Sequence, residues 1–340
     1  MLDKIKGTLI GGAAGDALGY AVEFMEDYAI FNRYGELGIT EYSLEDGKAL
    51  ISDDTQMTMF TIEGLLHARQ RPKAPSDDEY IEEIYKSYLD WFDTQRFNYD
   101  PSKVSERSLL MNVSDLYSPR APGNTCLLAL ESSLCGTLKF KINNSKGCGG
   151  VMRIAPIPLM LSRDDMPIER IDMLSARASA ITHGHELGYI PSAFISHVIS
   201  ALLVGQDPES AVMEARRTTS KLFCGYEYIE YFDQLMDKAI TLANDSDIDD
   251  LDAIRLIGQG WVAEETAAIA VYCFLKHKNS FGDAVIASVN HSGDSDSTGA
   301  VTGNLIGAYL GYSAIPNKFI ENLEHREILL SLAESLASKR

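Results

Sequence analysis

Two short acidic segments carry the residue types of a metal site: Ser52-Asp53-Asp54-Thr55 and Asp294-Ser295-Asp296-Ser297. Each segment precedes an apolar helical pattern. Taken alone, each is therefore explained by a helix N-terminus, where a Ser or Asp side chain caps free N–H groups and acids favour the positive end of the helix dipole. For either segment by itself, capping is the preferred interpretation.

The two segments together predict more than capping. One cap needs only one oxygen, and adjacent carboxylates repel each other unless a cation or a proton lies between them. The neighbouring hydroxyls add neutral oxygen ligands, and an all-oxygen set suits magnesium, manganese or calcium rather than zinc or copper. Four aspartates and two hydroxyls are enough to hold two octahedral ions, which activate water and orient an oxygen-rich substrate. We therefore expect a metal-dependent hydrolase.

A third segment, GGAAGDALGYAVEF at 11–24, holds a candidate general base. Its glycines allow close helix packing, and Asp16 is interpreted as a capping or packing acid. Glu23 follows the expected helix, in a region expected to be a loop. From there its carboxylate is placed to act on a metal-activated water.

Two further segments offer contacts for an anionic substrate. Gly147, Gly149 and Gly150 in SKGCGGVMRIAP leave backbone N–H groups accessible, as in loops that hold phosphate, although a glycine-rich turn is the commoner explanation. Arg153 is either an anion contact or a buried structural residue. In THGHELGY, His183 fits a hydrogen-bonding role to phosphate or ribose better than a metal-ligand role, with a capping or core histidine as the alternative.

The composition limits the class of protein. The net charge is −19 and no run of Lys or Arg occurs, so a nucleic-acid backbone binder is not expected. The five cysteines are scattered and form no CxxC pair, which argues against both a disulfide framework and a zinc–thiolate site. With no signal peptide and no run of about 18 apolar residues, a cytoplasmic protein without a membrane span is expected.

Helices are expected to position these residues, because apolar residues recur mainly at three- and four-residue spacing. The expected ranges are 2–20, 56–70, 77–93, 125–136, 169–181, 190–204, 207–221, 226–242, 261–276, 281–290, 297–311 and about 317–338. Residues 37–43 are a weak candidate for a short hairpin strand, and the acidic residues 243–252 for a solvated loop with a helix cap. One compact all-α domain over 1–340 is the simplest organisation.

In their order along the chain, these motifs resemble the ADP-ribosylglycohydrolase family. The resemblance rests on GDALG…E, SDDT, CGGVMR, TH, GWVAEE and GDSDSTGA, and it runs from about residue 5 to residue 311. It implies an orthogonal bundle of helices and a site for two Mg²⁺ ions, with Mn²⁺ as the alternative. By match to the family motifs, the metal ligands are Ser52, Asp53, Asp54, Asp294, Asp296 and Ser297.

The resemblance also assigns roles in catalysis and substrate binding. The catalytic group is Glu23, Asp54 and Asp296, with Glu23 acting on the attacking water. The loop from Gly147 to Met152, which comprises Gly147, Cys148, Gly149, Gly150, Val151 and Met152, is expected to wrap the diphosphate, with His183 nearby. Ser297 stands where many members have threonine and Cys148 where some have asparagine. A core position is favoured for Trp261 over one in the adenosine pocket.

The implied reaction is cleavage of the N- or O-glycosidic bond between ADP-ribose and a protein side chain, through an oxocarbenium-like transition state. The expected partners are ADP-ribose and ADP-ribosylated proteins, with arginine as the leading acceptor by analogy with bacterial members. Serine-linked or nucleic-acid-linked ADP-ribose, and a catalytically weak ADP-ribose-binding protein, stay open. An unrelated all-α phosphohydrolase is disfavoured because the chain contains no His-Asp dipeptide. A monomer is expected.

Overall fold

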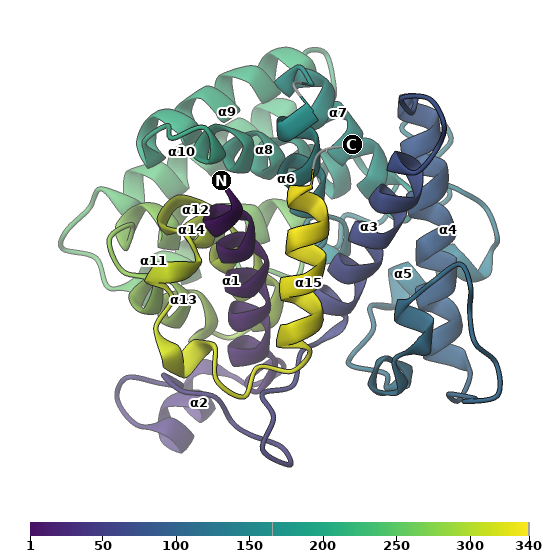
Figure 1. Cartoon of the computed structure of the whole chain (residues 1–340). Helices are drawn as coiled ribbons and strands as arrows, with labels where there is room; N and C mark the ends of the chain where they lie inside the picture. Colours follow the sequence, from purple (N-terminus) through teal and green to yellow (C-terminus); the bar gives the residue numbers. More distant parts are fainter. Residues whose placement is uncertain (165, 339–340) are drawn as a thin grey trace.

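A computed structural model describes residues 1–164 and 166–338, and over these residues the chain is built from α-helices and short 3-10 turns without a β-strand (Figure 1). The all-α prediction is therefore confirmed. The fifteen helices are α1 (Leu2–Tyr20), α2 (Asp27–Tyr34), α3 (Asp53–Arg69), α4 (Asp77–Arg96), α5 (Asn124–Glu131), α6 (Pro156–Leu161), α7 (Ile168–Ala180), α8 (Glu186–Leu203), α9 (Pro208–Leu222), α10 (Ile229–Ala243), α11 (Asp250–Ile257), α12 (Ala263–Lys276), α13 (Phe281–Val289), α14 (Ser295–Leu310) and α15 (Arg326–Ala337).

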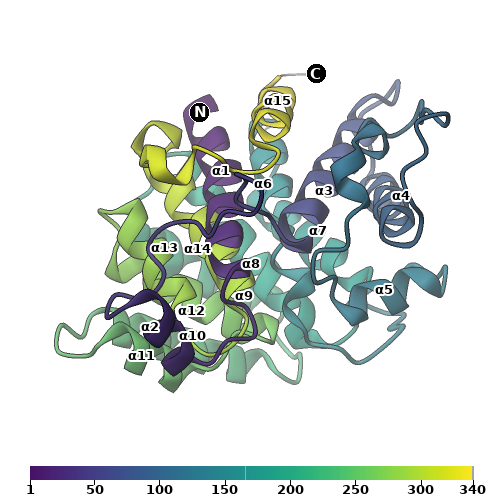
Figure 2. The ribbon, with the colours of Figure 1, turned by 90° about the horizontal axis from the view of Figure 1, so that it is seen from below.

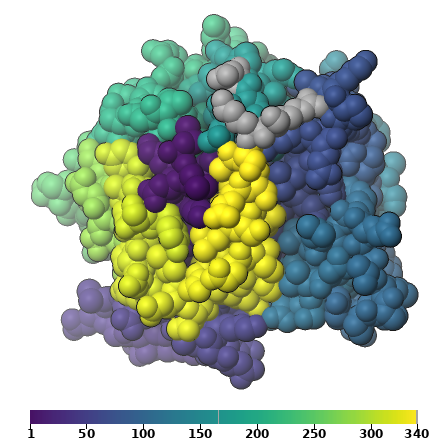
Figure 3. Space-filling view, in the orientation of Figure 1, coloured from purple at the N-terminus to yellow at the C-terminus, as the bar shows by residue number. Residues whose placement is uncertain are grey.

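The first and fourteenth helices form the centre of this arrangement (Figure 2). Helices α3, α4 and α5 lie on one side of this pair, and α10 to α13 lie on the other. The C-terminal helix α15 packs along α1, so the first and the last helix lie side by side on one face of the molecule (Figure 3). Segments more than 300 residues apart in the sequence are thereby brought together.

Glycines permit the close contact between α1 and α14. Four helical turns of α1 meet four of α14 in antiparallel order, through the pairs Gly7–Gly307, Gly11–Gly303, Gly15–Gly299 and Gly19–Ser295. A Cβ atom added at Gly15 would lie 1.9 Å from the carbonyl oxygen of Gly299, and one added at Gly303 would lie 1.9 Å from that of Gly11. Because no side chain fits at these distances, the expectation that the N-terminal glycines serve helix packing is confirmed.

The segment 37–43 contains no strand, so the weak hairpin prediction is wrong. The side chain of Asn290 replaces a partner strand there. Its Oδ1 accepts a hydrogen bond from the Ile39 N–H at 2.7 Å, and its Nδ2 donates to the Ile39 carbonyl at 3.0 Å. Because these two bonds satisfy both backbone groups of Ile39, this part of the chain needs no strand partner.

Several helix predictions need correction. The predictions did not include α2 or α6. The acidic stretch 243–252 was expected to be a solvated loop with a helix cap. The cap is confirmed, because the Asp249 carboxylate accepts from Leu251 N at 2.9 Å, but the loop is shorter than expected, since α11 begins at Asp250. The expected helix 317–338 is broken by His325, whose φ of 55° is left-handed, and α15 begins only after it. Likewise α5 ends at Glu131 instead of residue 136.

Helix α8 is long and apolar enough to cross a membrane by length and composition, with a mean hydropathy of 1.3 over Glu186–Leu203. However, 94% of this stretch is buried inside the protein, where α8 packs against α7, α9, α12 and α14. Burial among other helices of the same chain is what a core helix of a globular bundle shows.

Candidate active site

The first acidic segment begins helix α3, as the capping interpretation predicts. Ser52 is the N-cap residue, and its hydroxyl accepts a hydrogen bond from Asp54 N at 3.2 Å. Asp53 and Asp54 occupy the first turn and are 5% and 3% exposed. Asp53 Oδ2 accepts from Gly123 N at 3.2 Å, whereas the buried Asp54 Oδ2 has no hydrogen-bond partner among the described residues. Capping thus uses the serine and leaves an aspartate oxygen unsatisfied.

The second acidic segment begins helix α14 in the same way. Asp294 is the N-cap residue, and its Oδ1 accepts from Ser297 N at 3.2 Å, while Asp296 Oδ1 accepts from the same N–H at 2.9 Å. The thiol of Cys148 donates to Asp294 Oδ2 at 2.8 Å. Asp296 is only 3% exposed. The capping interpretation is again confirmed, and Cys148 gains a role in orienting an acid.

Asp16 connects the two acidic segments. It lies on α1, one residue after Gly15 in the glycine-lined contact with α14, and its carboxylate reaches the start of α3. There Oδ1 accepts from Ser52 N at 2.9 Å, and Oδ2 accepts from Thr55 N at 3.1 Å and from the Thr55 hydroxyl. The predicted capping role is confirmed, with the difference that Asp16 caps a helix other than its own.

The two segments share one cavity of about 330 Å³. It is lined by Glu23, Phe24, Asp53, Asp54, Asp294, Asp296 and Ser297, by residues 121–126, and by Gly147, Cys148, Gly149, Met152, His183 and Trp261. The joint site predicted from two separate motifs is therefore assembled around a single hollow, with Glu23 beside both clusters. Residues 121–126, which carry no acidic or glycine-rich pattern beyond Gly123, were not predicted.

Three predicted site residues do not line this cavity. Ser52 is fully buried, and its hydroxyl is used by the Asp54 N–H. Gly150 and Val151 face the interior: a Cβ atom at Gly150 would lie 2.7 Å from the Gly188 carbonyl, and Ser179 Oγ donates to Gly150 O at 3.0 Å. The 3-10 turn of Cys148–Gly150 therefore presents only its first part and the preceding Gly147 to the cavity.

The electrostatics of the cavity favour a cation. No Lys or Arg occurs among the described residues that line it. Burial, followed by the charge of Asp296, raises the pKa of Asp53, Asp54 and Asp294 well above the usual aspartate range. Burial and the charges of Asp296 and Asp294 raise the pKa of Glu23 to about 11. These buried acids are stabilised either by protons or by a positive ion.

The carboxylate and hydroxyl oxygens at the cavity are of the kind that bind a hard cation, although they do not form a complete coordination shell. Within residues 1–164 and 166–338, no group of three or more His, Cys, Asp or Glu side chains lies in ligating geometry. Among the described residues that line the cavity, two buried carboxylate oxygens nevertheless have no hydrogen-bond partner, Asp54 Oδ2 and Glu23 Oε2. Unsatisfied oxygens of this kind at the edge of a cavity are the ligands that magnesium and manganese take in proteins.

Two aromatic side chains lie at the cavity, and one of them corrects a prediction. Trp261 is 38% exposed rather than a core residue, and it stacks on Phe24 with ring centroids 5.6 Å apart and planes 22° apart. Phe24 follows Glu23 with a left-handed φ of 66°. Because that conformation is rare for a bulky residue, the sequence gives no signal that Phe24 reaches the cavity.

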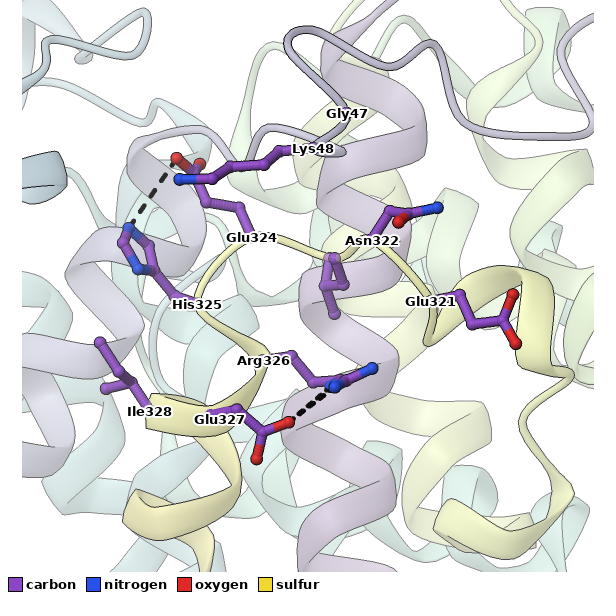
Figure 4. Close-up of a pocket in the computed structure, with 10 residues that line it drawn as sticks. Gly47, Lys48, Glu321, Asn322, Glu324, His325, Arg326, Glu327 and Ile328 are labelled. Atoms are coloured by element: carbon purple, nitrogen blue, oxygen red, sulfur yellow. Dashed lines mark hydrogen bonds and ion pairs between the residues drawn. The ribbon is translucent and has the colours of Figure 1, made fainter.

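The loop that carries the first acidic segment is held from outside by the C-terminal part of the chain. Ala49 N donates to Asn322 O at 2.8 Å and Glu324 N donates to Ala49 O at 3.0 Å. The Glu324 carboxylate then accepts from Ile51 N and from Arg120, each at 3.2 Å. Figure 4 shows Glu324 beside His325, just before α15. The C-terminal segment thus holds residues 49–51, which lead into helix α3 and Asp53, in place.

Known proteins are similar to this chain in sequence and in fold. The family model for ADP-ribosylglycohydrolase matches residues 1–340. An ADP-ribosylarginine hydrolase of Serratia proteamaculans is 26% identical, covering 98% of this chain and 79% of the relative. The ADP-ribosyl-dinitrogen reductase glycohydrolase of Rhodospirillum rubrum is 24% identical, covering 95% and 90%. A solved structure titled as an ADP-ribosylglycohydrolase-related protein complex has the same fold, with a TM-score of 0.63 at 21% identity over 98% and 97% of the two chains.

The match over residues 1–340 confirms the family resemblance predicted for about residues 5 to 311, and the solved structure confirms the fold. The chain belongs to the ADP-ribosylglycohydrolase family and is a hydrolase of that class.

Proposed function

We propose that this protein is a metal-dependent hydrolase that releases ADP-ribose from modified arginine side chains. The observation that carries the proposal is the shared cavity, in which two acidic helix N-termini and Glu23 meet without a cationic side chain. The name of the Serratia relative, an ADP-ribosylarginine hydrolase, supports arginine as the acceptor. The name of the Rhodospirillum relative, which acts on ADP-ribosyl-dinitrogen reductase, supports a protein substrate. Serine-linked and nucleic-acid-linked ADP-ribose are the alternative substrates.

Two magnesium ions, with manganese as the alternative, would be held by Asp53, Asp54, Asp294, Asp296 and the hydroxyl of Ser297, with Ser52 contributing through its position at the cap. When bound, such ions would supply positive charge that holds the ribose hydroxyls and polarises the attacking water. The main-chain N–H of Gly149 and the ring of His183 would bind the anionic part of the substrate. The N–H groups of Gly147 and Cys148 do not contribute, because they donate to Ser145 Oγ at 3.3 Å and to the Trp261 carbonyl at 3.4 Å. Phe24 and Trp261 narrow the cavity and exclude water from it.

Glu23 is the residue proposed to take a proton from the attacking water. With the aspartates unneutralised its pKa is about 11, so it is protonated at neutral pH and cannot act as a base. A cation held by the aspartates would offset the repulsion from Asp296 and Asp294, which adds to burial in raising the pKa of Glu23, and would so lower that pKa. The proposal therefore links the activity of Glu23 to occupation of the acidic clusters.

The proposed function is tested by incubating the full-length protein with arginine-, serine- and nucleic-acid-linked ADP-ribose, with and without Mg²⁺ or Mn²⁺. Release of free ADP-ribose is expected from the arginine-linked substrate, and only when the metal is present. Release of ADP-ribose from the serine-linked substrate alone would show that the acceptor residue is serine and not arginine. Binding of ADP-ribose without release from any substrate would overturn the enzymatic proposal in favour of a binding protein.

Glu23→Gln is expected to lower kcat by about 10²–10⁴-fold, the range for loss of a positioned general base, while the Kd for ADP-ribose changes little. Steady-state kinetics and calorimetric titration with ADP-ribose measure the two quantities. Glu26→Gln, a replacement at the N-cap position of α2 outside the cavity, serves as the matched control. A large loss of affinity at unchanged kcat would contradict the role of Glu23 as base.

The metal-free protein is expected to lose stability as the pH rises. Burial and Asp296 raise the pKa of Asp16 from 3.8 to about 7, so between these values the folded protein binds more protons than the unfolded chain. Its stability therefore falls as the pH increases through this window, and the full penalty is present above about pH 7. Mg²⁺ should consequently raise the Tm more at pH 8 than at pH 6.

Calorimetry at both pH values, in chelator and in MgCl₂ at matched ionic strength, measures this linkage. A metal-free Tm that increases from pH 6 to pH 8, with no added stabilisation by Mg²⁺, would mean that the acidic clusters are not a cation site.

A further inference from the structure

Arg153 is completely buried, and within residues 1–164 and 166–338 no carboxylate pairs with it. Its Nη2 donates to Thr182 Oγ1 at 2.6 Å, and its Nη1 lies 3.2 Å from Met57 Sδ and 3.3 Å from Cys126 Sγ. The guanidinium carbon lies 4.3 Å from the centre of the Tyr88 ring. The sequence allowed an anion contact or a buried structural role for Arg153, and the structure shows the buried role.

The hydrogen bond from Arg153 decides where the proton of Thr182 points. A guanidinium only donates, so Thr182 Oγ1 is the acceptor and its own proton is free to be donated elsewhere. His183 Nδ1 lies 2.8 Å from the same oxygen. The thiol of Cys126 also lies near Thr182, but sulfur is a weak acceptor, so the imidazole nitrogen is the strongest acceptor for this proton.

A histidine that accepts at Nδ1 and is neutral carries its hydrogen on Nε2. Burial, followed by the charge of Arg153, lowers the pKa of His183 to about 3, so the ring is neutral at physiological pH. Nε2 has no hydrogen-bond partner among the described residues, and His183 lines the cavity although it is only 1% exposed. A Cβ atom at Gly147 would lie 3.4 Å from Nε2, so the Nε2 edge of the ring faces the glycine loop.

We propose that Arg153 and Thr182 are positioning residues that hold His183 as its neutral Nε2–H tautomer, so that it donates one hydrogen bond into the cavity to an anionic oxygen of the ligand. The identity of the ligand as ADP-ribose rests on the proposed function, whereas the tautomer does not. His183 thereby adds one hydrogen-bond donor of fixed direction beside the glycine loop. Because its ring is neutral, it adds no positive charge near the acidic clusters.

The tautomer is tested directly by nitrogen NMR of full-length protein labelled with ¹⁵N-histidine, with the His183 signals assigned by comparison with His183→Gln. In the wild type, His183 is expected to show a protonated Nε2 and an unprotonated Nδ1. Thr182→Val should disturb this signature, and Thr182→Ser, which keeps the hydroxyl, should restore it. An Nδ1–H signature in the wild type, or an unchanged signature in Thr182→Val, overturns the proposal.

Binding of free ADP-ribose is the second measurement. Thr182→Val is expected to raise the Kd about tenfold, the effect of a misdirected hydrogen bond, with a smaller change in kcat. Thr302→Val is the matched control, because the Thr302 hydroxyl is buried in α14 without a partner among the described residues. An equal Kd in Thr182→Val and Thr302→Val would contradict the proposal that Thr182 positions His183. If His183 has the expected tautomer but the protein releases no ADP-ribose from any substrate, the proposed function is refuted, whereas the positioning of His183 by Arg153 and Thr182 is retained.

Discussion

Asp296→Ala is expected to lower kcat/KM by about a thousand-fold or more, since the loss of a metal ligand removes several kcal/mol of transition-state stabilisation. Asp296 is the carboxylate whose charge raises the pKa of Asp16, Glu23, Asp53, Asp54 and Asp294 alike. It therefore lies at the electrostatic centre of the cavity. Its removal should eliminate most of the stabilisation that Mg²⁺ confers on the folded protein.

The metal-free form of this variant should behave in the opposite way. Removal of one of several mutually repelling charges relieves the folded state, so the Tm of Asp296→Ala in chelator is expected to exceed that of the wild type. This combination separates loss of a ligand from misfolding, which would lower both activity and Tm. Asp283→Ala is the control, because Asp283 is an exposed acid in the first turn of α13. Near-normal Mg²⁺-dependent turnover in Asp296→Ala would refute the joint site.

Gly303→Ala is expected to destabilise the protein by about 3 kcal/mol or more, at the upper end of the cost of overpacking a core. The added methyl group would lie 1.9 Å from the carbonyl oxygen of Gly11, which is backbone and cannot rotate away. Alanine's better helix propensity offsets only about 1 kcal/mol of this cost. Helices α1 and α14 must therefore separate, and with them Asp16 and Asp296, so metal affinity should fall together with stability.

Urea unfolding of Gly303→Ala and of Gly282→Ala measures this effect against a matched control. Gly282 is also helical, but a Cβ atom there would meet only the Phe319 ring at 3.4 Å, an ordinary contact. Gly282→Ala is thus expected to be neutral or slightly stabilising, by up to about 1 kcal/mol. Equal midpoints for the two variants would show that the glycines do not determine the separation of α1 and α14.

Much of the fold could be predicted from the sequence because helix formation is governed by near neighbours. Apolar spacing located α1, α8 and α14 to within a few residues of their observed ends, apart from the four residues before 190 that open α8. The failures have long-range causes. Asn290 supplies the partner of Ile39, and Glu324 fixes the approach to α3 from 273 residues away. No local pattern encodes such contacts.

The sequence by itself determined the chemical groups on offer: carboxylates and hydroxyls at two helix N-termini, a glutamate after the first helix, and glycines that allow close packing of α1. These are local properties, since a cap is set within three or four residues. Only the tertiary structure decided which of those groups face one cavity. Close packing of α1 on α14 brings Asp296 to Asp16. Other contacts between distant segments leave the Ser52 side chain, Gly150 and Val151 outside the cavity and place Phe24 and Trp261 beside it. The physical reason is that the direction of a side chain at the cavity depends on contacts with segments that lie hundreds of residues away along the chain.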